Sequence, residues 1–505
     1  MTSALDLTVP ELAARVSRGE VSAESLTRES LARIRESDLN AFLHVAGDAA
    51  LEAARAVDVR RAKGDALGPL AGVPIAIKDA LCTKDQPATC ASKILVRAKG
   101  GAPATSPEGG FRPPYDATVV ERLRHAGAVL VGKANMDEFA MGSSNENSAF
   151  GPVKNPWDRT RTPGGSSGGS AASVAARLVA GSLGSDTGGS IRQPAGLTGV
   201  VGVKPTYGRV SRYGLIAFAS SLDQVGPFAT DVRGAARLLE VIAGRDAHDS
   251  TSSHVPVGGY EAACDRPVKG LRIGVPREYF AEGLDREVEE SVRAAIAALG
   301  AEGCSVHDVD MPHTRYGLAT YYIVATAEAS SNLARFDGVR FGLRAEKPGT
   351  DLQAMYAATR GQGFGPEVKR RIMLGTYALA AGYYDAYYKK AQQVRTLIKR
   401  DFDEAFANVD VLLTPISPTP AFKLGDKLDD PVKMYLSDVY TLPASLAGVC
   451  ALSVPCAPSP ATKDRPSLPI GLQIIAPAFA EERLFQMASA WERLSPSRGQ
   501  RPPSA

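Results

Sequence analysis

The sequence predicts an α/β protein built on one large mixed β-sheet that is covered by helices on both faces. Short apolar runs typical of buried strands alternate along the chain with segments of helical periodicity. Of the 505 residues, 44% are hydrophobic and 22% are charged, which is typical of a globular protein with a sizeable core. No apolar run approaches the ~20 residues of a membrane span, so we expect no contact with a membrane.

Residues 1–65 are expected to form a helical segment that packs on the core. Thr8 and Glu11 have the spacing of a capping box at the start of a first helix. Ser22 could begin a second helix, which carries Leu26 and Ile34 on its apolar face.

The main domain is expected at residues 66–490, where strand and helix patterns alternate. An apolar run preceded by turn residues predicts a strand at 70–79, and helical spacing followed by Gly127 predicts a helix at 119–126. A strand should follow at 128–132 and a helix of small residues at 170–179. Thr230 could begin a further helix.

The second half of this domain continues the alternation. Residues 271–310 predict a strand, a helix and another strand, arranged as a βαβ-like unit. A long helical region is expected at 366–408, and buried strands are expected at 410–414 and 470–474.

Two segments have compositions that bury little apolar surface. Residues 97–114 are rich in glycine, alanine and proline, and we expect a mobile surface insertion there. The proline-, serine- and arginine-rich end of the chain, 491–505, is expected to be a disordered tail.

Charge and cysteine content exclude several classes of function. The net charge of +3 offers no electrostatic surface for tight nucleic-acid binding by this chain alone. The six cysteines form no CxxC pair, so reduced and mostly buried thiols are expected. His307 and His313 lack metal-ligand spacing, and no metal site is predicted. The first residues show no basic region followed by an apolar one, so a cytoplasmic location is expected.

Two glycine–serine runs indicate acyl-transfer chemistry. Ser166 lies in the run 162–170, and Ser190 follows it by 24 residues at the end of the run 184–190. Amide cleavage by a serine needs a base for the hydroxyl, donors for the oxyanion and a proton for the leaving amine. Ser190 is the candidate nucleophile, and Lys78, at the end of an apolar strand, can act as base if burial keeps it neutral. Ser166 can relay the proton, since a hydroxyl both donates and accepts.

The residues before the nucleophile can form an oxyanion hole. Glycine lets the backbone curl closely around a ligand. The N–H groups expected to point at one position are those of Thr187, Gly188, Gly189 and Ser190.

Each of these residues also has a structural interpretation. Glycine–serine runs are usually flexible linkers, and a lysine that ends a strand usually extends to water. Asp186 could be a turn residue. The combination favours a site, because linkers do not lie between helix and strand patterns and recur 24 residues apart.

The glycine–serine run resembles the hallmark of the amidase signature family. Three further stretches, at 135–144, 209–224 and 368–376, make the chain similar to the A subunits of aspartyl/glutamyl-tRNA(Asn/Gln) amidotransferases, over residues 5–490. The resemblance implies the amidase signature fold. It also implies a Ser–cis-Ser–Lys triad, which falls on Ser190, Ser166 and Lys78.

The same resemblance implies a glutamine pocket. Arg371 should bind the α-carboxylate and Asp438 the α-amino group, and both residue types suit these charges. Neighbours on a helix diverge by about 100°, so only one of Arg370 and Arg371 can point inward; we choose Arg371, the alternative being a solvated helix face.

The implied function is that of a glutaminase subunit. It would hydrolyse glutamine and supply ammonia for converting Glu-tRNA(Gln), Asp-tRNA(Asn) or both into Gln-tRNA(Gln) and Asn-tRNA(Asn). The resemblance implies a heterotrimer that also contains the B and C subunits of the amidotransferase, in which misacylated tRNA binds mainly through the B subunit and the partner uses ATP and Mg²⁺. No cofactor is expected in this chain, which has no G-x-x-x-x-G-K-[ST] run.

Other interpretations remain open at this stage. A free-standing amidase acting on small apolar amides would share the triad but lack the Arg371 and Asp438 clamp, and a scaffold on the same fold would lack catalysis altogether. The tyrosines and lysines at 383–399 could bind nucleic acid. We favour an amphipathic helix whose aromatic side faces the core and whose lysines face water.

Overall fold

The computed structural model describes residues 3–97, 106–345, 351–463 and 465–503. Within these ranges, eleven strands form one sheet in the order β1-β3-β2-β4-β6-β5-β10-β11-β9-β7-β8. β2 is parallel to β3 and β4, and β7 is parallel to β8 and β9, while the other pairs are antiparallel. The predicted mixed sheet is therefore confirmed. The strands are β1 Phe42–Val45, β2 Pro74–Lys78, β3 Val129–Ala134, β4 Gly181–Asp186, β5 Val201–Lys204, β6 Gln224–Ala229, β7 Arg272–Pro276, β8 Ser305–Val309, β9 Val411–Pro415, β10 Cys450–Pro455 and β11 Gly471–Ala476.

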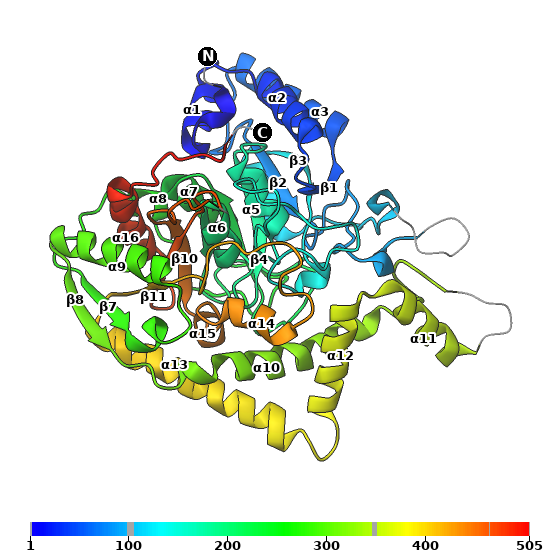
Figure 1. Ribbon diagram of the computed structural model, residues 1–505. Coiled ribbons are helices and arrows are strands. Elements are labelled where there is room, and N and C mark those ends of the chain that lie inside the picture. The colour runs from blue at the N-terminus through cyan, green and yellow to red at the C-terminus, as the bar shows by residue number, and fades with distance from the viewer. Residues whose placement is uncertain (1–2, 98–105, 346–350, 464, 504–505) are drawn as a thin grey trace.

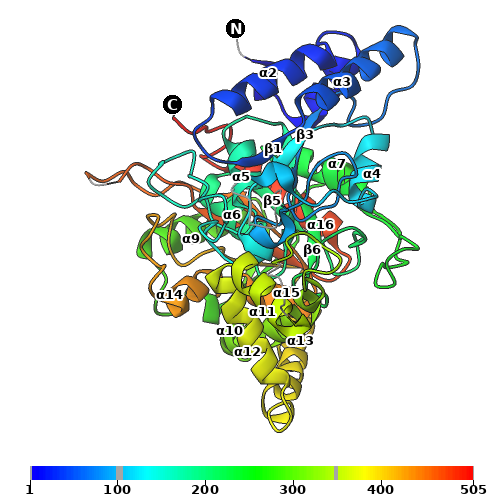
Figure 2. The same ribbon diagram turned by 90° about the vertical axis from the view of Figure 1, so that its right-hand side faces the viewer.

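Helices lie on both sides of the sheet, as the first two views show (Figure 1, Figure 2). α5 and α6 contact each other and cover β4 and β5, whereas α7 and α16 contact each other and cover β6 and β10. The helices are α1 Val9–Ser17, α2 Ala23–Glu36, α3 Gly47–Ala62, α4 Thr118–His125, α5 Gly168–Ala175, α6 Arg192–Thr198, α7 Val232–Ile242, α8 Tyr260–Ala263, α9 Arg286–Ala301, α10 Gly317–Asn332, α11 Leu352–Gly363, α12 Pro366–Leu379, α13 Lys390–Asn408, α14 Pro431–Tyr435, α15 Leu442–Ala447 and α16 Glu481–Leu494.

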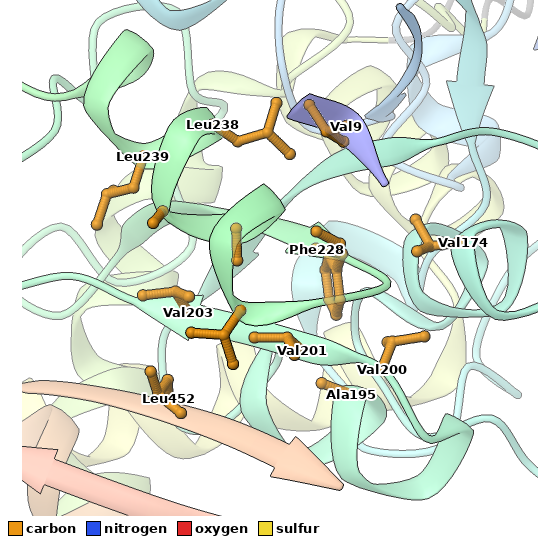
Figure 3. Packing of buried hydrophobic residues seen from close by; sticks show 14 of the residues in the cluster. Val9, Val174, Ala195, Val200, Val201, Val203, Phe228, Leu238, Leu239 and Leu452 are labelled. Carbon is orange, nitrogen blue, oxygen red and sulfur yellow. The ribbon is translucent and has the colours of Figure 1, made fainter. Parts of the chain in front are cut away.

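The N-terminal helices begin where the capping residues predict. The Thr8 hydroxyl accepts a hydrogen bond from the N–H of Glu11, whose carboxylate accepts from the N–H of Thr8. Ser22 caps α2, since its hydroxyl accepts from the N–H of Ser25. Val9 of α1 is fully buried beside α7 and β6, near Phe228 (Figure 3), so the first helix is part of the main core.

The central elements form where the sequence pattern predicts them, except that the residue that caps α7 is one position later than expected. β7, α9 and β8 form the expected βαβ-like unit, in which β7 and β8 are parallel. α7 is capped by Asp231 and not by Thr230, because the Asp231 carboxylate accepts from the N–H of Gly234.

The tyrosines between α12 and α13 do not face the core, so the amphipathic interpretation is wrong for them. The helical region at 366–408 is interrupted by a π-helical turn, Asp385–Lys389, and α12 and α13 form a hairpin that projects away from the sheet (Figure 2). Tyr383 and Tyr384 are 42% and 46% exposed. The hairpin tip lies beyond the core, and its tyrosines pack on each other instead, with ring centroids of Tyr377 and Tyr383 4.4 Å apart.

The two segments expected to lack order differ from that expectation where the structure describes them. Residues 98–105 lie outside the described residues, but Gly110 and Phe111 form β-bridges with Val96 and Ala88. At the C-terminus, α16 extends to Leu494, and the hydroxyl of Ser495 donates to the Pro455 carbonyl at 2.9 Å. Hydrogen bonds to the end of β10 thus hold the predicted tail on the core, and Arg501 further along forms an ion pair with Asp6 at 2.8 Å.

All six cysteines are buried and unpaired, as expected. Within the described ranges, no helix is both long and apolar enough to cross a membrane.

Candidate active site

Lys78 lies at the end of β2, between the neighbouring strands β3 and β4, and its side chain is completely buried. Its Nζ donates hydrogen bonds to Ser166 Oγ and to Ser167 Oγ, both at 2.7 Å, and lies 3.4 Å from the Ser185 carbonyl. The alternative in which the lysine extends to water is therefore wrong. β2 places this amine beneath both glycine–serine runs.

Burial lowers the pKa of Lys78 to about 7, although the charges of Asp137, Asp186 and Asp223 oppose the shift. No carboxylate of a described residue lies within ion-pair distance of its Nζ. A lysine without an anionic partner in a dry site loses its proton readily. The site can therefore hold a neutral amine near neutral pH.

The Ser166 loop is fixed from several sides. The Gly165–Ser166 peptide bond is cis. The Gly165 N–H donates to Gln193 Oε1 at 3.0 Å, and the Ser166 carbonyl accepts from the N–H of Asp137 at 3.1 Å. These contacts present the Ser166 hydroxyl to the lysine below it.

The Ser190 loop turns its carbonyl groups toward the protein. The carbonyls of Gly188, Gly189 and Ser190 accept from Thr441 Oγ1, Gln193 N–H and Ser167 N–H at 2.5, 2.8 and 3.1 Å. The backbone N–H groups of residues 187–190 donate no hydrogen bond to another residue in the described part of the chain. Ser190 itself is 7% exposed. This loop therefore keeps its backbone donors free beside a serine hydroxyl.

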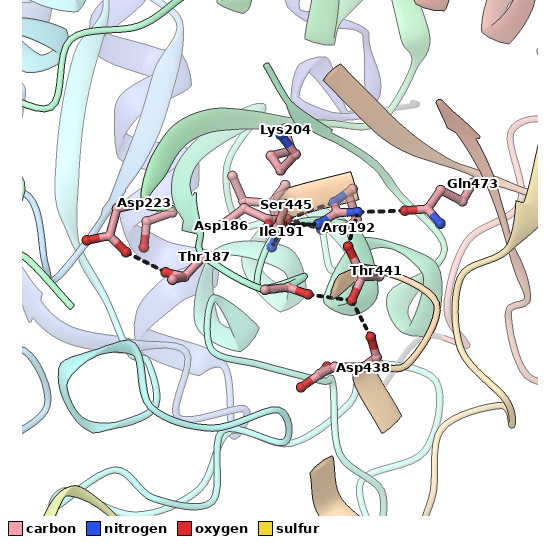
Figure 4. Close-up of polar contacts among 12 residues, drawn as sticks. Asp186, Thr187, Ile191, Arg192, Lys204, Asp223, Asp438, Thr441, Ser445 and Gln473 are labelled. Atoms are coloured by element: carbon pink, nitrogen blue, oxygen red, sulfur yellow. Dashed lines mark hydrogen bonds and ion pairs between the residues drawn. The ribbon is translucent and has the colours of Figure 1, made fainter. Parts of the chain in front are cut away.

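A buried ion pair lies next to this loop (Figure 4). The carboxylate of Asp186 accepts from Arg192 Nε and Nη2, each at 3.0 Å, and from the N–H of Ile191. Burial alone would raise the pKa of Asp186, but the Arg192 charge holds it below its usual value. The alternative in which Asp186 is only a turn residue is therefore wrong. It joins the end of β4 to the start of α6 and so fixes the backbone on either side of Ser190.

Asp438 is linked to the Ser190 loop through Thr441, and Arg371 lies close enough for its charge to act on the Asp438 carboxyl. Thr441 Oγ1 lies 2.5 Å from the Gly188 carbonyl and 2.9 Å from the Asp438 carbonyl (Figure 4). Burial raises the pKa of the Asp438 carboxyl to about 7, against a hydrogen bond from Ser143 and the charge of Arg371. An acidic side chain, Asp438, and a basic one, Arg371, therefore lie close to each other near the Ser190 loop.

The two neighbouring arginines of α12 point in different directions. Arg371 is 2% exposed, whereas the side chain of Arg370 is 45% exposed. Nε of Arg371 donates to Glu367 at 2.8 Å, and its Nη groups donate to no other residue that the structure describes. The guanidinium carbon also lies 5.1 Å from the ring of Tyr322 and 5.3 Å from that of Tyr435. The Nε atom of Arg371 is thus held by Glu367, while its two Nη groups, which we call its outer edge, remain available to a ligand.

Several residues of the site were not found from the sequence. Ser167 was passed over although it adjoins Ser166 in the same run, and its hydroxyl contacts Lys78 as closely as Ser166 does. No sequence pattern around Tyr322 or Tyr435 distinguishes them from aromatic residues of the core. In the described residues, no group of three or more histidine, cysteine or acidic side chains could hold a metal ion.

The chain is similar to known proteins over almost its whole length. The family model described as Amidase matches residues 25–485. The A subunit of the glutamyl-tRNA(Gln) amidotransferase of Myxococcus xanthus is 59% identical over 490 residues, 97% of each chain, and that of Chloroflexus aurantiacus is 58% identical over 504 residues, 99% of each chain. The crystal structure of the A subunit of the glutamyl-tRNA(Gln) amidotransferase from Thermotoga maritima superposes with a TM-score of 0.80 at 42% identity, covering 99% of this chain and 98% of that one.

Proposed function

Because this chain belongs to the amidase signature family, we propose that it hydrolyses glutamine as the glutaminase subunit of a tRNA-dependent amidotransferase. The observation that carries the proposal is the contact of 2.7 Å between the buried Lys78 Nζ and Ser166 Oγ. The N–H of the next residue, Ser167, donates to the Ser190 carbonyl, and the Ser190 loop keeps its backbone N–H donors free. Thr441 links this loop to Asp438, on which the charge of Arg371 acts.

Ser190 is the nucleophile in this proposal. A neutral Lys78 has two N–H donors and one lone pair, which match its three neighbours. The N–H groups bond to Ser167 Oγ and the Ser185 carbonyl, and the lone pair accepts the Ser166 proton. Ser166 in turn takes the proton of Ser190 as that hydroxyl attacks the side-chain amide, and the same path later returns a proton to the leaving ammonia. Water then cleaves the glutamyl ester and releases glutamate.

The oxyanion formed during this attack is stabilised by the N–H groups of Thr187, Gly188, Gly189 and Ser190. The carbonyls of Gly188, Gly189 and Ser190 already accept hydrogen bonds from the protein, so we expect the loop to need no rearrangement when negative charge develops. A donor of this kind is worth about 2.7–4 kcal/mol in the transition state.

Glutamine is recognised by its two charged α-substituents. The α-carboxylate binds the outer Nη edge of Arg371, and the α-ammonium binds the carboxylate of Asp438. Apolar amides have neither group, so this pair selects glutamine over them.

The ammonia serves a partner protein. The names of the relatives, each the A subunit of an amidotransferase, support a place in a complex with partner subunits. We further propose that these partners are B and C subunits and that misacylated tRNA binds mainly through the B subunit. The partner uses ATP and Mg²⁺ to activate the tRNA-bound carboxylate, and this chain needs no cofactor of its own. The complex acts in translation, and its place is the cytoplasm.

Replacing Arg371 with methionine tests substrate choice. We expect kcat/KM for glutamine to fall about 100-fold or more, because the α-carboxylate loses its buried charged partner. Hydrolysis of an uncharged aryl amide should be unchanged. Arg370→Met is the matched control, since the exposed neighbour on the same helix should leave both rates as they are. Steady-state kinetics of the purified complex provide the measurement, and a complex that cleaves the aryl amide but not glutamine would instead be a free-standing amidase.

The rate should depend on pH in a way that separates the two titrating groups. Lys78 must be neutral and Asp438 must be charged, and both have a pKa of about 7. Both conditions improve as pH rises, so log kcat/KM for glutamine should rise below pH 6 with a slope near two and level off above pH 8. An aryl amide needs only the amine, and its slope should be near one. Equal slopes for both substrates would remove Asp438 from substrate binding.

A further inference from the structure

The two glycines before Ser190 depend on their surroundings for their conformation. Gly188 and Gly189 have no Cβ, so the peptide plane between them turns with little steric resistance. Gly189 has a φ of +148°, which other residues rarely adopt. The peptide bond between the two glycines is trans, so its carbonyl and its N–H point in opposite directions. The group that holds the Gly188 carbonyl therefore also decides where the Gly189 N–H points.

Thr441 holds the Gly188 carbonyl (Figure 4). Its Oγ1 lies 2.5 Å from the carbonyl oxygen of Gly188 and 2.9 Å from that of Asp438. The Asp438 carbonyl also accepts the Thr441 N–H at 2.9 Å, whereas the Gly188 carbonyl has no second donor in the described part of the chain. A hydroxyl has one proton to donate, and a buried carbonyl without a donor is costly. The hydroxyl proton therefore goes to Gly188.

The side chain of Thr441 has little freedom to move away from the glycines. It is fully buried, and the carbonyl of the same residue accepts from Arg192 Nη1 at 3.0 Å. Arg192 in turn pairs with Asp186, which precedes the loop. A Cβ on Gly189 would lie 2.2 Å from Thr441 Oγ1, so the threonine packs directly on this glycine. The hydroxyl thus has a fixed place against the loop that precedes Ser190.

The next two carbonyls of the loop are held by the main chain instead. The carbonyls of Gly189 and Ser190 accept from the N–H groups of Gln193 and Ser167 at 2.8 and 3.1 Å. Such backbone donors remain when a side chain is replaced. Of the carbonyls of residues 188–190, only that of Gly188 accepts from a side chain in the part of the chain that the structure describes. The orientation of one oxyanion donor therefore depends on a single hydroxyl.

We propose that Thr441 is a positioning residue of the oxyanion hole. Its hydroxyl fixes the Gly188 carbonyl and so turns the Gly189 N–H toward the oxygen of the amide that Ser190 attacks. This inference rests on the proposed role of Ser190 as nucleophile. An N–H aimed at developing charge acts in the transition state, so its loss lowers kcat and leaves KM nearly unchanged. Removing one such donor typically lowers kcat by about 10²–10³-fold.

Thr441→Val tests the proposal in the purified complex, because it removes the hydroxyl and keeps the shape of the side chain. We expect kcat to fall about 100-fold or more for glutamine and for an uncharged aryl amide alike, with each KM changed by less than about threefold. Thr441→Ser keeps the hydroxyl and should restore kcat to within about fivefold of the natural rate. Thr314→Val is the matched control. Thr314 is also buried, and its N–H and hydroxyl both donate to the carbonyl three residues earlier, that of Met311, so its replacement should leave both rates unchanged.

A trifluoromethyl ketone analogue of the aryl amide measures the oxyanion hole directly. The Ser190 oxygen adds to its carbonyl carbon, the Ser190 proton passes to Ser166 as the Ser166 proton passes to Lys78, and the negative charge stays on the former carbonyl oxygen. The inhibition constant for Thr441→Val should rise by the same factor by which kcat/KM falls. An unchanged inhibition constant, an unchanged kcat, or a serine variant as slow as the valine variant would each overturn the proposal. So would a loss confined to glutamine, because Thr441 would then act on Asp438 alone.

Melting curves establish that each variant is folded. If Thr441→Val is not, Thr441→Cys takes its place, and its weaker S–H donor should lower kcat for both substrates by about tenfold or more; a cysteine variant with the natural kcat overturns the proposal. The two substrates also separate this inference from the proposed function. A complex that cleaves only the aryl amide would refute the glutaminase activity, and the aryl amide rates alone would then decide the role of Thr441.

Discussion

Replacing Ser190 with alanine is expected to lower kcat/KM for glutamine by at least about 10⁴-fold, since the members of a catalytic set act as a unit. The substitution removes only the attacking oxygen and leaves the backbone donors of the loop in place. The variant should still bind glutamine, because Arg371 and Asp438 are untouched. Glutamate release from the purified complex measures the rate, and calorimetry measures the binding.

Ser173→Ala is the control for this variant. Ser173 is also a buried serine, but it lies on α5 and its hydroxyl donates only to the Ser170 carbonyl, at 2.9 Å. Its loss should leave glutamine hydrolysis near the natural rate. A Ser190→Ala protein that retains a tenth of the natural activity would exclude this serine as nucleophile, and with it the triad.

Replacing Lys78 with methionine should slow formation of the glutamyl ester by about 10²–10⁴-fold, the usual contribution of a general base. Methionine fills the same space with an apolar chain, so we expect the variant to fold. Rapid-quench detection of the covalent intermediate provides the measurement. The remaining activity should lose the rise with pH that the amine causes.

Lys204→Met is the matched control, because it removes another buried lysine that has no part in the proposed catalysis. Lys204 is also fully buried, burial lowers its pKa to about 8, and it donates to the carbonyls of Pro205 and Val449. Its removal should change the melting temperature but not the rate of ester formation. Normal ester formation in Lys78→Met would assign the role of base to another group.

Local patterns predicted the elements with regular periodicity. The strand that carries Lys78 is apolar and preceded by turn residues, and β7, α9 and β8 alternate strand and helix patterns at ordinary lengths. β4 could not be predicted in this way, because its sequence of glycine, serine, leucine and aspartate has no strand pattern. Its residues are selected by tertiary contacts: a Cβ on Gly184 would lie 2.6 Å from the Phe228 ring and 2.9 Å from Ser167 Oγ.

In the candidate site too, residues in local sequence patterns could be predicted, whereas residues joined by tertiary contacts could not. Lys78, Ser166 and Ser190 lie in recognisable local runs, and the angle between neighbours on a helix limited the choice to one of Arg370 and Arg371. Ser143 and Asp438 are 295 residues apart in the chain and form a hydrogen bond only because the fold brings them together. Tyr322 and Tyr435 reach Arg371 from α10 and α14 for the same reason. Contacts of this length depend on topology, which no local pattern contains.

The ion pair between Arg501 and Asp6 has a practical consequence for handling the protein. It brings the two described chain ends together at one pole of the molecule, while α12, which carries Arg371, lies toward the opposite pole (Figure 2). A purification handle or a surface anchor fused to either end would therefore lie away from Arg371. A short peptide joining both ends would give a circularly permuted chain, in which new ends could be opened far from Lys78, Ser166 and Ser190.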